Sequence, residues 1–164
     1  MEKANMIGEL VRLVGRENVL SSDMHFKLYE YDASLIRSKP DCIVLPTSTE
    51  QVSKVVKFAH DHKIPVIARG AGTNLSGGSV TVRGGIAIVL TKMNRILDMD
   101  IENLRVVVEP GVVTLDLKNV LARHGYLYQP DPASEKVTTI GGNFAENSGG
   151  PHCLKYGVTS NHVL

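Results

Sequence analysis

The sequence predicts an α+β protein made of two small α/β subdomains. Short apolar runs of strand length alternate with stretches of helical periodicity along most of the chain. Two glycine-rich loops, residues 69–78 and 138–150, fall one in each half. The 164 residues are enough for two such units around real hydrophobic cores.

Residues 3–14 are predicted to form an amphipathic helix. Ile7, Leu10 and Val14 fall at helical spacing, and Gly15 follows as a stop signal. Residues 21–40 show no clear period and end in a linker-like stretch. We therefore expect residues 1–40 to be an N-terminal helical extension.

The next segment is typical of a βαβ unit with parallel strands. Residues 42–45 form a short apolar run, Ser48 and Gln51 make a capping box, and residues 64–68 form a second apolar run. Residues 85–90 are almost continuously apolar, which predicts a buried central strand.

A hairpin and a helix are predicted after this segment. Residues 96–100 and 104–109 suit a tight hairpin, and Thr114 is expected to cap a helix that ends at Gly125. We place the two subdomains at residues 41–105 and 106–164. An apolar run begins at residues 161–164, so we expect the second subdomain to be truncated. A short terminal strand that completes a small sheet is the alternative.

The first glycine-rich loop has the sequence Arg-Gly-Ala-Gly-Thr-Asn-Leu-Ser-Gly-Gly. Backbone N–H groups in such a loop can approach an anionic phosphate closely. Ser79 and Val80 follow where a P-loop has Lys-Ser/Thr, and Leu75 stands where a Rossmann fingerprint has its third glycine. The pattern indicates a phosphate-bearing ligand outside these two designs, and a purely conformational β-turn is the alternative.

The second loop carries hydroxyl and amide side chains among its glycines, and a Pro-Asp-Pro turn at residues 130–132 precedes it. Two loops of this kind suggest two walls of one extended ligand. Two unrelated surface loops are the alternative.

Composition argues against several other functions. The net charge is +1, only 5% of residues are aromatic and Trp is absent, which disfavours nucleic-acid binding. Cys42 and Cys153 are isolated, so no zinc motif or disulfide framework is indicated, and Cys153 is expected to be buried or inert. Residues 1–15 lack the apolar core expected of a signal peptide, and no apolar run approaches membrane-spanning length. A cytoplasmic protein is expected, with peripheral attachment to the inner membrane left open.

The order of motifs resembles the FAD-linked oxidase family, whose flavin domain is of the vanillyl-alcohol-oxidase (PCMH) type. The resemblance covers nearly the whole chain and is greatest to the glycolate oxidase D subunit and the D-lactate dehydrogenases. The motifs that carry it are Arg69–Gly78, Glu109-Pro110-Gly111, Pro130-Asp131-Pro132, Thr139–Asn143, Ala145–Gly150 and His152–Gly157.

The resemblance implies a PCMH-type FAD-binding fold of two subdomains, the second incomplete, that hold FAD. Thr73 stands where some members attach flavin to a His, so noncovalent FAD is expected. The implied cofactor-binding residues are Pro46, Arg69, Gly70, Ala71, Gly72, Thr73, Asn74, Leu75, Gly77, Gly78, Pro110, Gly111, Pro130, Asp131, Thr138, Thr139, Gly141, Gly142, Asn143, Asn147, Gly149, Gly150 and Gly157.

The implied reaction is hydride transfer from a D-2-hydroxy acid to flavin N5. Full family enzymes are much longer, and their substrate domain carries the catalytic groups and metal ligands. No catalytic or metal-binding residue is therefore assigned, and the chain alone is expected to be inactive.

Other interpretations stay open. The chain could be a noncatalytic fragment that self-associates and does not retain FAD, or the fold could serve a sugar or an aromatic alcohol. A homodimer or other oxidase subunits are the partners considered. His152 is expected to be a hydrogen-bonded structural residue, with a catalytic base as the alternative.

Overall fold

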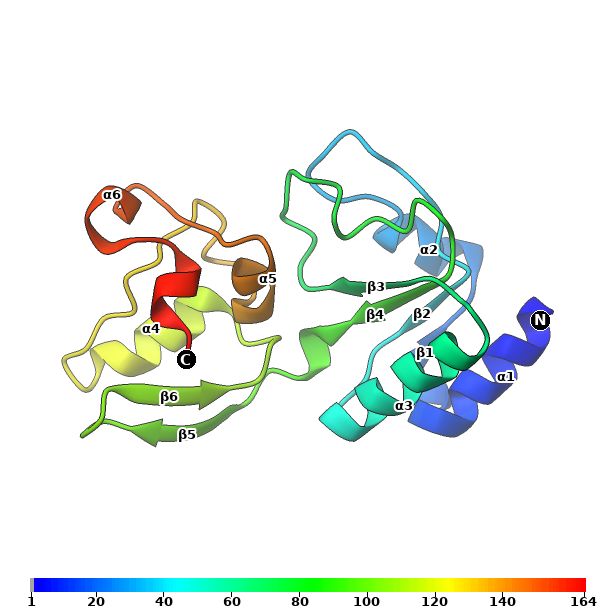
Figure 1. Ribbon diagram of the computed structural model, residues 1–164, viewed down its shortest axis with the longest axis horizontal. Helices are drawn as coiled ribbons and strands as arrows, with labels where there is room; N and C mark the ends of the chain where they lie inside the picture. The colour runs from blue at the N-terminus through cyan, green and yellow to red at the C-terminus, as the bar shows by residue number, and fades with distance from the viewer. Residues whose placement is uncertain (1) are drawn as a thin grey trace. The chain divides into compact units, whose positions relative to one another are not determined.

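The computed structural model describes residues 2–164, which form two compact units that divide between Lys92 and Met93 (Figure 1). The predicted boundary at 105/106 lies later, inside a hairpin. The first hairpin strand, Ile96–Asp100, pairs with the second, Arg105–Val108, so both belong to unit 2. The predicted N-terminal extension is not separate either, because residues up to 40 belong to unit 1.

Unit 1 contains a four-stranded sheet in the order β1-β2-β4-β3. The predicted parallel βαβ unit is present, but β2 and β3 do not touch. Both pair with β4, which lies between them, and β1 pairs antiparallel with β2. The strands are β1 (Val19–Leu20), β2 (Cys42–Val44), β3 (Val66–Arg69) and β4 (Ile86–Val89).

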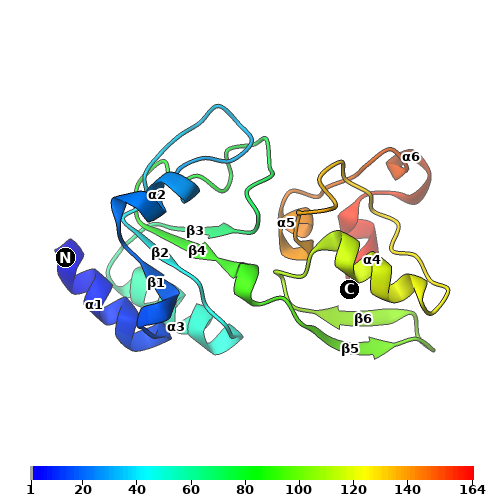
Figure 2. The same cartoon turned by 180° about the vertical axis from the view of Figure 1, so that it is seen from behind.

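The two faces of this sheet bury different side chains. Cys42, Val44, Ile86 and Ile88 pack with helices α1 (Lys3–Val14) and α3 (Thr49–Asp61). Ile43, Ala87 and Val89 on the other face pack with Phe26 of α2 (Asp23–Tyr29). Figures 1 and 2 show α1 and α3 together on one side of the strands and α2 on the other. Successive side chains of β2 and β4 point to opposite faces of the sheet, and both faces are buried. Unit 1 therefore has three layers, with α1 and α3 on one side of the sheet and α2 on the other.

Helix α1 forms as its periodicity predicts. Met6, Leu10 and Val14 are buried in the core that α1 shares with α3, and the helix ends at Gly15, whose φ is +90°. Leu10 is fully buried, so the N-terminal segment supplies part of the core of unit 1.

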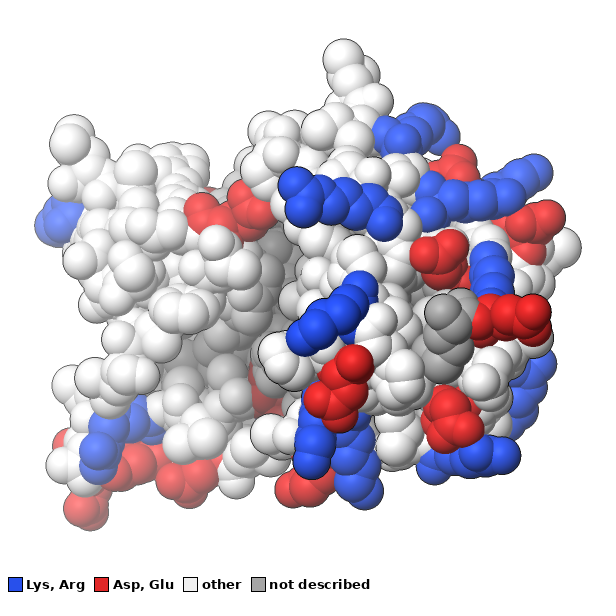
Figure 3. Space-filling view, turned by 45° about the vertical axis from the view of Figure 1, so that its right-hand side comes forward, with Lys and Arg blue, Asp and Glu red and all other residues white. Residues whose placement is uncertain are grey.

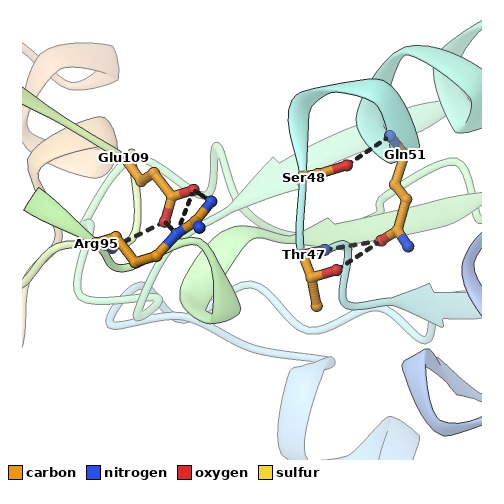
Figure 4. Close-up of polar contacts among 5 residues, drawn as sticks. All are labelled: Thr47, Ser48, Gln51, Arg95 and Glu109. Carbon is orange, nitrogen blue, oxygen red and sulfur yellow. Dashed lines mark hydrogen bonds and ion pairs between the residues drawn. The ribbon is translucent and has the colours of Figure 1, made fainter. Parts of the chain in front are cut away.

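The capping box at the start of α3 differs slightly from the predicted form (Figure 4). Ser48 Oγ accepts a hydrogen bond from Gln51 N at 3.3 Å. Gln51 Oε1 accepts from the backbone N–H of Thr47 at 2.8 Å, one residue before the N-cap. Only the Ser48 half of the capping box is therefore present, and the Gln51 side chain binds the residue before the N-cap instead of the N-cap itself.

Unit 2 contains the β5–β6 hairpin, three short α-helices and a 3-10 helix at Thr159–His162. Thr114 is the first helical residue rather than the predicted cap, which is Val113, and its hydroxyl turns inward instead. The helix ends at Ala122, and Gly125 follows it with a φ of +79°. The elements are β5 (Ile96–Asp100), β6 (Arg105–Val108), α4 (Thr114–Ala122), α5 (Ile140–Ala145) and α6 (Cys153–Tyr156). No helix in residues 2–164 is long and apolar enough to cross a membrane.

Candidate cofactor site

The first glycine-rich loop leaves the carboxyl end of β3 and has unpaired backbone donors. Within residues 2–164, the N–H groups of residues 71–75 donate no hydrogen bond to another part of the chain. Ala71 and Leu75 are exposed, and Gly72, Thr73 and Asn74 are half-buried. Buried or half-buried N–H groups normally have acceptors, so this run is suited to bind an external anion.

Two glycines fix the course of this loop. Gly72 and Gly77 have φ of +71° and +76°, a region that L-residues with side chains rarely adopt. A Cβ on Gly72 would lie 2.2 Å from Arg69 Nη2, and one on Gly77 would lie 2.6 Å from Ile36 Cδ1. Neighbouring side chains of the protein therefore leave no room for a side chain at either position, whether or not a ligand is bound.

The buried Arg69 side chain binds Ser79, the residue that follows the loop. It is 6% exposed, and its Nη1 donates to Ser79 O at 3.3 Å and to Ser79 Oγ at 3.4 Å. Its guanidinium carbon lies 5.6 Å from the centre of the Tyr29 ring. Burial lowers the pKa of Arg69, and the charge of Asp32 acts in the opposite direction. The predicted binding residue is thus a buried cation behind the loop.

Sequence reasoning missed Asp32, which lies in the stretch without clear period. Asp32 is 5% exposed and accepts a hydrogen bond from Asn74 Nδ2 at 2.7 Å. Asn74 Oδ1 in turn accepts from Ser79 Oγ at 2.7 Å. The predicted residue Asn74 therefore uses its side chain within the protein. An Asp in an aperiodic stretch was the only available signal.

The second glycine-rich region is held together by a buried polar cluster. Asn143 is fully buried, and its Nδ2 donates to Thr114 Oγ1 at 2.6 Å. Thr138 Oγ1 donates to Asn143 Oδ1 at 2.8 Å. Thr139 is also buried, and its Oγ1 caps α5 by accepting from Gly142 N at 3.2 Å. The side chains of these three predicted residues face the interior of unit 2 and hold the turn in place.

Pro110 and Gly141 make a close backbone contact in this unit. Gly141 N donates to Pro110 O at 2.8 Å, and a Cβ on Gly141 would lie 2.6 Å from Pro110 Cβ. The buried Gly111 adds a hydrogen bond from its N–H to Met93 O at 2.7 Å. These predicted residues form one packed corner.

An ion pair that the sequence did not reveal fixes this corner (Figure 4). Arg95 Nη2 donates to Glu109 Oε1 at 2.7 Å, and the Arg95 backbone N–H donates to Glu109 Oε2 at 2.8 Å. Hydrogen bonds from Arg95 hold the pKa of the Glu109 carboxyl below its ordinary value. The Glu-Pro-Gly motif is thereby anchored immediately before Pro110.

The Pro-Asp-Pro turn contacts the end of the second loop. Asp131 Oδ2 forms a hydrogen bond and ion pair with His152 Nδ1, and Asp131 Oδ1 accepts from His152 N at 3.4 Å. Burial acts to raise the pKa of Asp131, but the His152 contacts outweigh it and keep the pKa low. A Cβ on Gly150 would lie 2.1 Å from Asp131 Oδ1. His152 is thus a hydrogen-bonded residue, as the sequence predicts.

The remaining predicted residues occupy varied places. Pro46 and Pro130 are buried, Gly70 is half-buried, and Gly78 is exposed and donates to Ser76 Oγ at 3.0 Å. Asn147 has a φ of +48°, and its Oδ1 accepts from Ser160 N at 3.0 Å. The two other predicted glycines, Gly149 and Gly157, are half-buried beside Cys153 and Asn161 respectively. Cys153 was expected to be buried or inert; it is exposed, so the first of these two expectations is wrong.

The charge distribution is mixed. Figure 3 shows Lys and Arg side chains interspersed with Asp and Glu over the face of unit 1 that is turned toward the viewer. Residues 2–164 contain no group of three His, Cys, Asp or Glu side chains arranged to hold a metal ion.

The geometry of the first loop fits a phosphate-bearing ligand. In the described part of the chain, five consecutive backbone N–H groups are free, two glycines keep side chains away, and a buried cation lies behind them. Anion-binding concavities in proteins are built from such successive N–H groups.

Comparison with known families agrees with this geometry. The family described as "FAD binding domain" matches residues 40–164. The chain belongs to this family, and its fold is the α+β, PCMH-type FAD-binding fold. The cofactor of the family is FAD.

Among curated proteins, the chain is 42% identical over 157 residues to glycolate oxidase subunit GlcD of Bacillus subtilis (strain 168). This alignment covers 95% of the chain and 33% of GlcD. Identity is also 42% over 157 residues to a D-lactate dehydrogenase of Anaerostipes hadrus, with 94% and 33% covered. The chain therefore spans about a third of the length of these relatives.

Solved structures give the same fold. An alkyldihydroxyacetonephosphate synthase superposes with a TM-score of 0.88 at 25% identity, over 98% of this chain and 32% of the synthase. A 4-ethylphenol oxidase from Gulosibacter chungangensis superposes with a TM-score of 0.78 at 30% identity, over 90% and 29% of the two chains.

Proposed function

We propose that the chain is the FAD-binding portion of a flavin-dependent D-2-hydroxy-acid oxidoreductase of the glycolate oxidase or D-lactate dehydrogenase type. The observation that carries the proposal is the run of N–H groups at residues 71–75 that have no acceptor within residues 2–164. These groups would hold the pyrophosphate of FAD without a lysine, because hydrogen bonds to a charged acceptor contribute roughly 1.5–3 kcal/mol each.

The names of the relatives support the substrate class. Curated relatives at 35–42% identity act, by name, on glycolate, D-lactate or D-2-hydroxyglutarate. The solved neighbours that are named for phenols and cresol are 26–30% identical. A 2-hydroxy acid is therefore a better candidate than an aromatic alcohol.

Residues of this chain would bind and orient the cofactor. In unit 1, Gly70, Ala71, Gly72, Thr73 and Leu75 would face the pyrophosphate with their backbone, while Arg69 and Asn74 keep the loop in shape. When bound, FAD supplies the two-electron acceptor whose N5 takes the hydride of the 2-hydroxy acid. Thr73 at the attachment position favours noncovalent FAD.

The residues that bind the substrate and take its proton are proposed to lie outside this chain, in the part of the relatives that it does not span. The chain by itself is then a cofactor-binding unit without turnover. Because GlcD is by name a subunit, assembly with other oxidase subunits is part of the proposal. A cytoplasmic location of this protein, with or without peripheral attachment to the inner membrane, stays a prediction.

FAD binding by the purified chain tests the proposal directly. The protein is mixed with FAD, desalted, and examined by visible spectrum and by quenching of flavin fluorescence during titration. Retained flavin at one FAD per chain is expected. A folded protein that stays colourless and does not quench flavin would contradict it.

A self-associating fragment is the second candidate function. A groove of about 1350 Å³ in unit 2 is lined largely by apolar side chains, and Leu104, Leu127 and Phe144 beside it are more than half exposed. Neither outer edge of the β5–β6 hairpin pairs with another strand within residues 2–164. Exposed apolar surface and open strand edges favour association. Light scattering would show a concentration-dependent dimer, and Leu127→Glu would convert it to monomer.

A further inference from the structure

A segment outside the matched family region packs on the glycine loop. The family match begins at residue 40, whereas residues 30–38 precede it. Ala33 N donates to Asn74 O at 3.1 Å, and the Ile36 side chain fills the space beside Gly77. At the far end, Ser38 Oγ donates to Thr81 O at 2.8 Å. This N-terminal segment thus contacts the second half of the loop and the residues that follow it.

Asp32 is the centre of this contact. Its Oδ1 accepts from Ser34 N at 2.8 Å, which fixes its own segment. Its Oδ2 accepts from Asn74 Nδ2 at 2.7 Å. Ser79 Oγ, which donates to Asn74 Oδ1 at 2.7 Å, lies 3.5 Å from the same carboxylate oxygen, so Asp32, Asn74 and Ser79 form one connected group. One 5%-exposed carboxylate thus joins two segments that are 42 residues apart in sequence.

The position of this carboxylate needs an explanation. A negative charge behind a phosphate-binding loop acts against binding by simple electrostatics, because it opposes the positive field of Arg69. The hydrogen bonds offer a benefit that offsets this cost. A loop already in its binding shape does not lose conformational freedom when the ligand arrives.

We propose that Asp32 is a positioning residue for the cofactor loop: through Asn74 and Ser79 it holds residues 71–75 with their N–H groups free before FAD binds. Residues 30–38 then contribute to the shape of the cofactor site, although they lie outside the family match. This inference rests on the proposed FAD-binding function.

The two effects of Asp32 predict opposite outcomes for Asp32→Asn. Loss of the charge alone would strengthen FAD binding. Loss of positioning would weaken it, because the introduced amide has one acceptor oxygen instead of two, so its NH2 group would face the donor of either Ser34 N or Asn74 Nδ2. We expect FAD affinity to fall roughly tenfold. Unchanged or tighter binding would overturn the inference.

Exchanging the two side chains provides a rescue. In the double variant Asp32→Asn/Asn74→Asp, the new amide donates to the new carboxylate, and Ser79 Oγ keeps its acceptor. The total charge of the pair is unchanged. Affinity is expected to return to within roughly threefold of the wild type, since the hydrogen bonds are restored. A double variant no better than the single one would count against the hydrogen-bond explanation.

Hydrogen exchange without FAD separates this inference from the proposed function. Asp32→Asn should accelerate amide exchange at Ala33, Gly78 and Val80, whose N–H groups are hydrogen-bonded in and beside the loop, and leave β4 unchanged. Asp41→Asn is the matched control, since Asp41 Oδ2 also accepts a backbone N–H, from Gly85 at 2.6 Å, but does not touch the loop. Wild-type protein that fails to bind FAD refutes the function. Loop exchange that is the same in Asp32→Asn and wild type refutes the positioning role.

Discussion

Gly72 lies directly over the guanidinium of Arg69, so that an added Cβ would stand 2.2 Å from Nη2. The two residues are three positions apart and form the inside of one turn. The glycine is therefore required by an internal neighbour as well as by its φ of +71°.

Gly72→Ala should weaken FAD binding roughly tenfold or more, because the left-handed conformation alone costs about 1–2 kcal/mol for a residue with a side chain. Gly125→Ala is the control. Gly125 has a similar φ of +79°, but a Cβ there would meet nothing within 4 Å. Titration with FAD should separate the two. Equal affinities in both variants would contradict the assignment of the cradle to residues 71–75.

Thr114→Val should destabilise unit 2 by about 1–3 kcal/mol, since it leaves the buried Asn143 amide without its acceptor. Thr47→Val removes an exposed hydroxyl bonded to Gln51 at 3.2 Å and should cost less than about 0.5 kcal/mol. Urea unfolding followed by far-UV circular dichroism gives both midpoints. Similar midpoints would mean that the Asn143 cluster is not a stabilising element.

Leu10→Ala should destabilise unit 1 by about 2–5 kcal/mol, because it leaves a cavity between α1 and the sheet. Leu28→Ala, at a side chain that is 61% exposed, is the matched control and should have little effect. If the N-terminal segment were a detached extension, both variants would unfold at the wild-type midpoint in the same urea experiment.

Stability should fall in acid. Hydrogen bonds from Arg95 place the folded-state pKa of Glu109 below its ordinary 4.5. Its contribution is complete above pH 4.5 and is lost as the pH falls through the folded-state pKa. The thermal midpoint is expected to be flat from pH 8 to about 5 and to decline below that. Glu109→Gln should lower the midpoint at pH 7 and reduce the decline, whereas Glu102→Gln, at an exposed side chain, should match the wild type. An unchanged decline in Glu109→Gln would exclude this pair as a source.

The two thiols should differ in reactivity. Burial raises the pKa of Cys42 to about 11, while Cys153 is exposed. A disulfide reagent at pH 8 should label one thiol per native chain and two after unfolding. Cys153→Ser should abolish the native labelling. Labelling of Cys42 in the native protein would show that the sheet of unit 1 opens readily.

Local patterns in the sequence were sufficient for the regular elements. The spacing of Leu10 and Val14 located α1, and the pair Ser48 and Gln51 located the start of α3, because these signals depend on neighbours within one turn. The insertion of β4 between β2 and β3 was not predicted, since strand order depends on contacts that a periodicity does not contain.

The glycine loops were recognised, but the groups that support them were not. Asp32, Arg95 and Glu109 act across 14 to 47 residues of sequence, and a lone charged residue carries no local signal of its partner. Conversely, Asn143 has the composition of a binding residue, yet its amide is consumed by Thr114 and Thr138. Polar residues in glycine-rich turns serve the turn as readily as a ligand.

The position of β4 sets an order for folding. Of the three strand pairs in unit 1, only β1–β2 can form before β4 exists, because β2 and β3 each take β4 as their partner. During synthesis, the helices up to α3 would be complete while β2 and β3 still lacked β4, their shared neighbour. The four strands can pair into one sheet only after Val89 has left the ribosome. That step pairs β2 with β4, which lie more than forty residues apart in sequence.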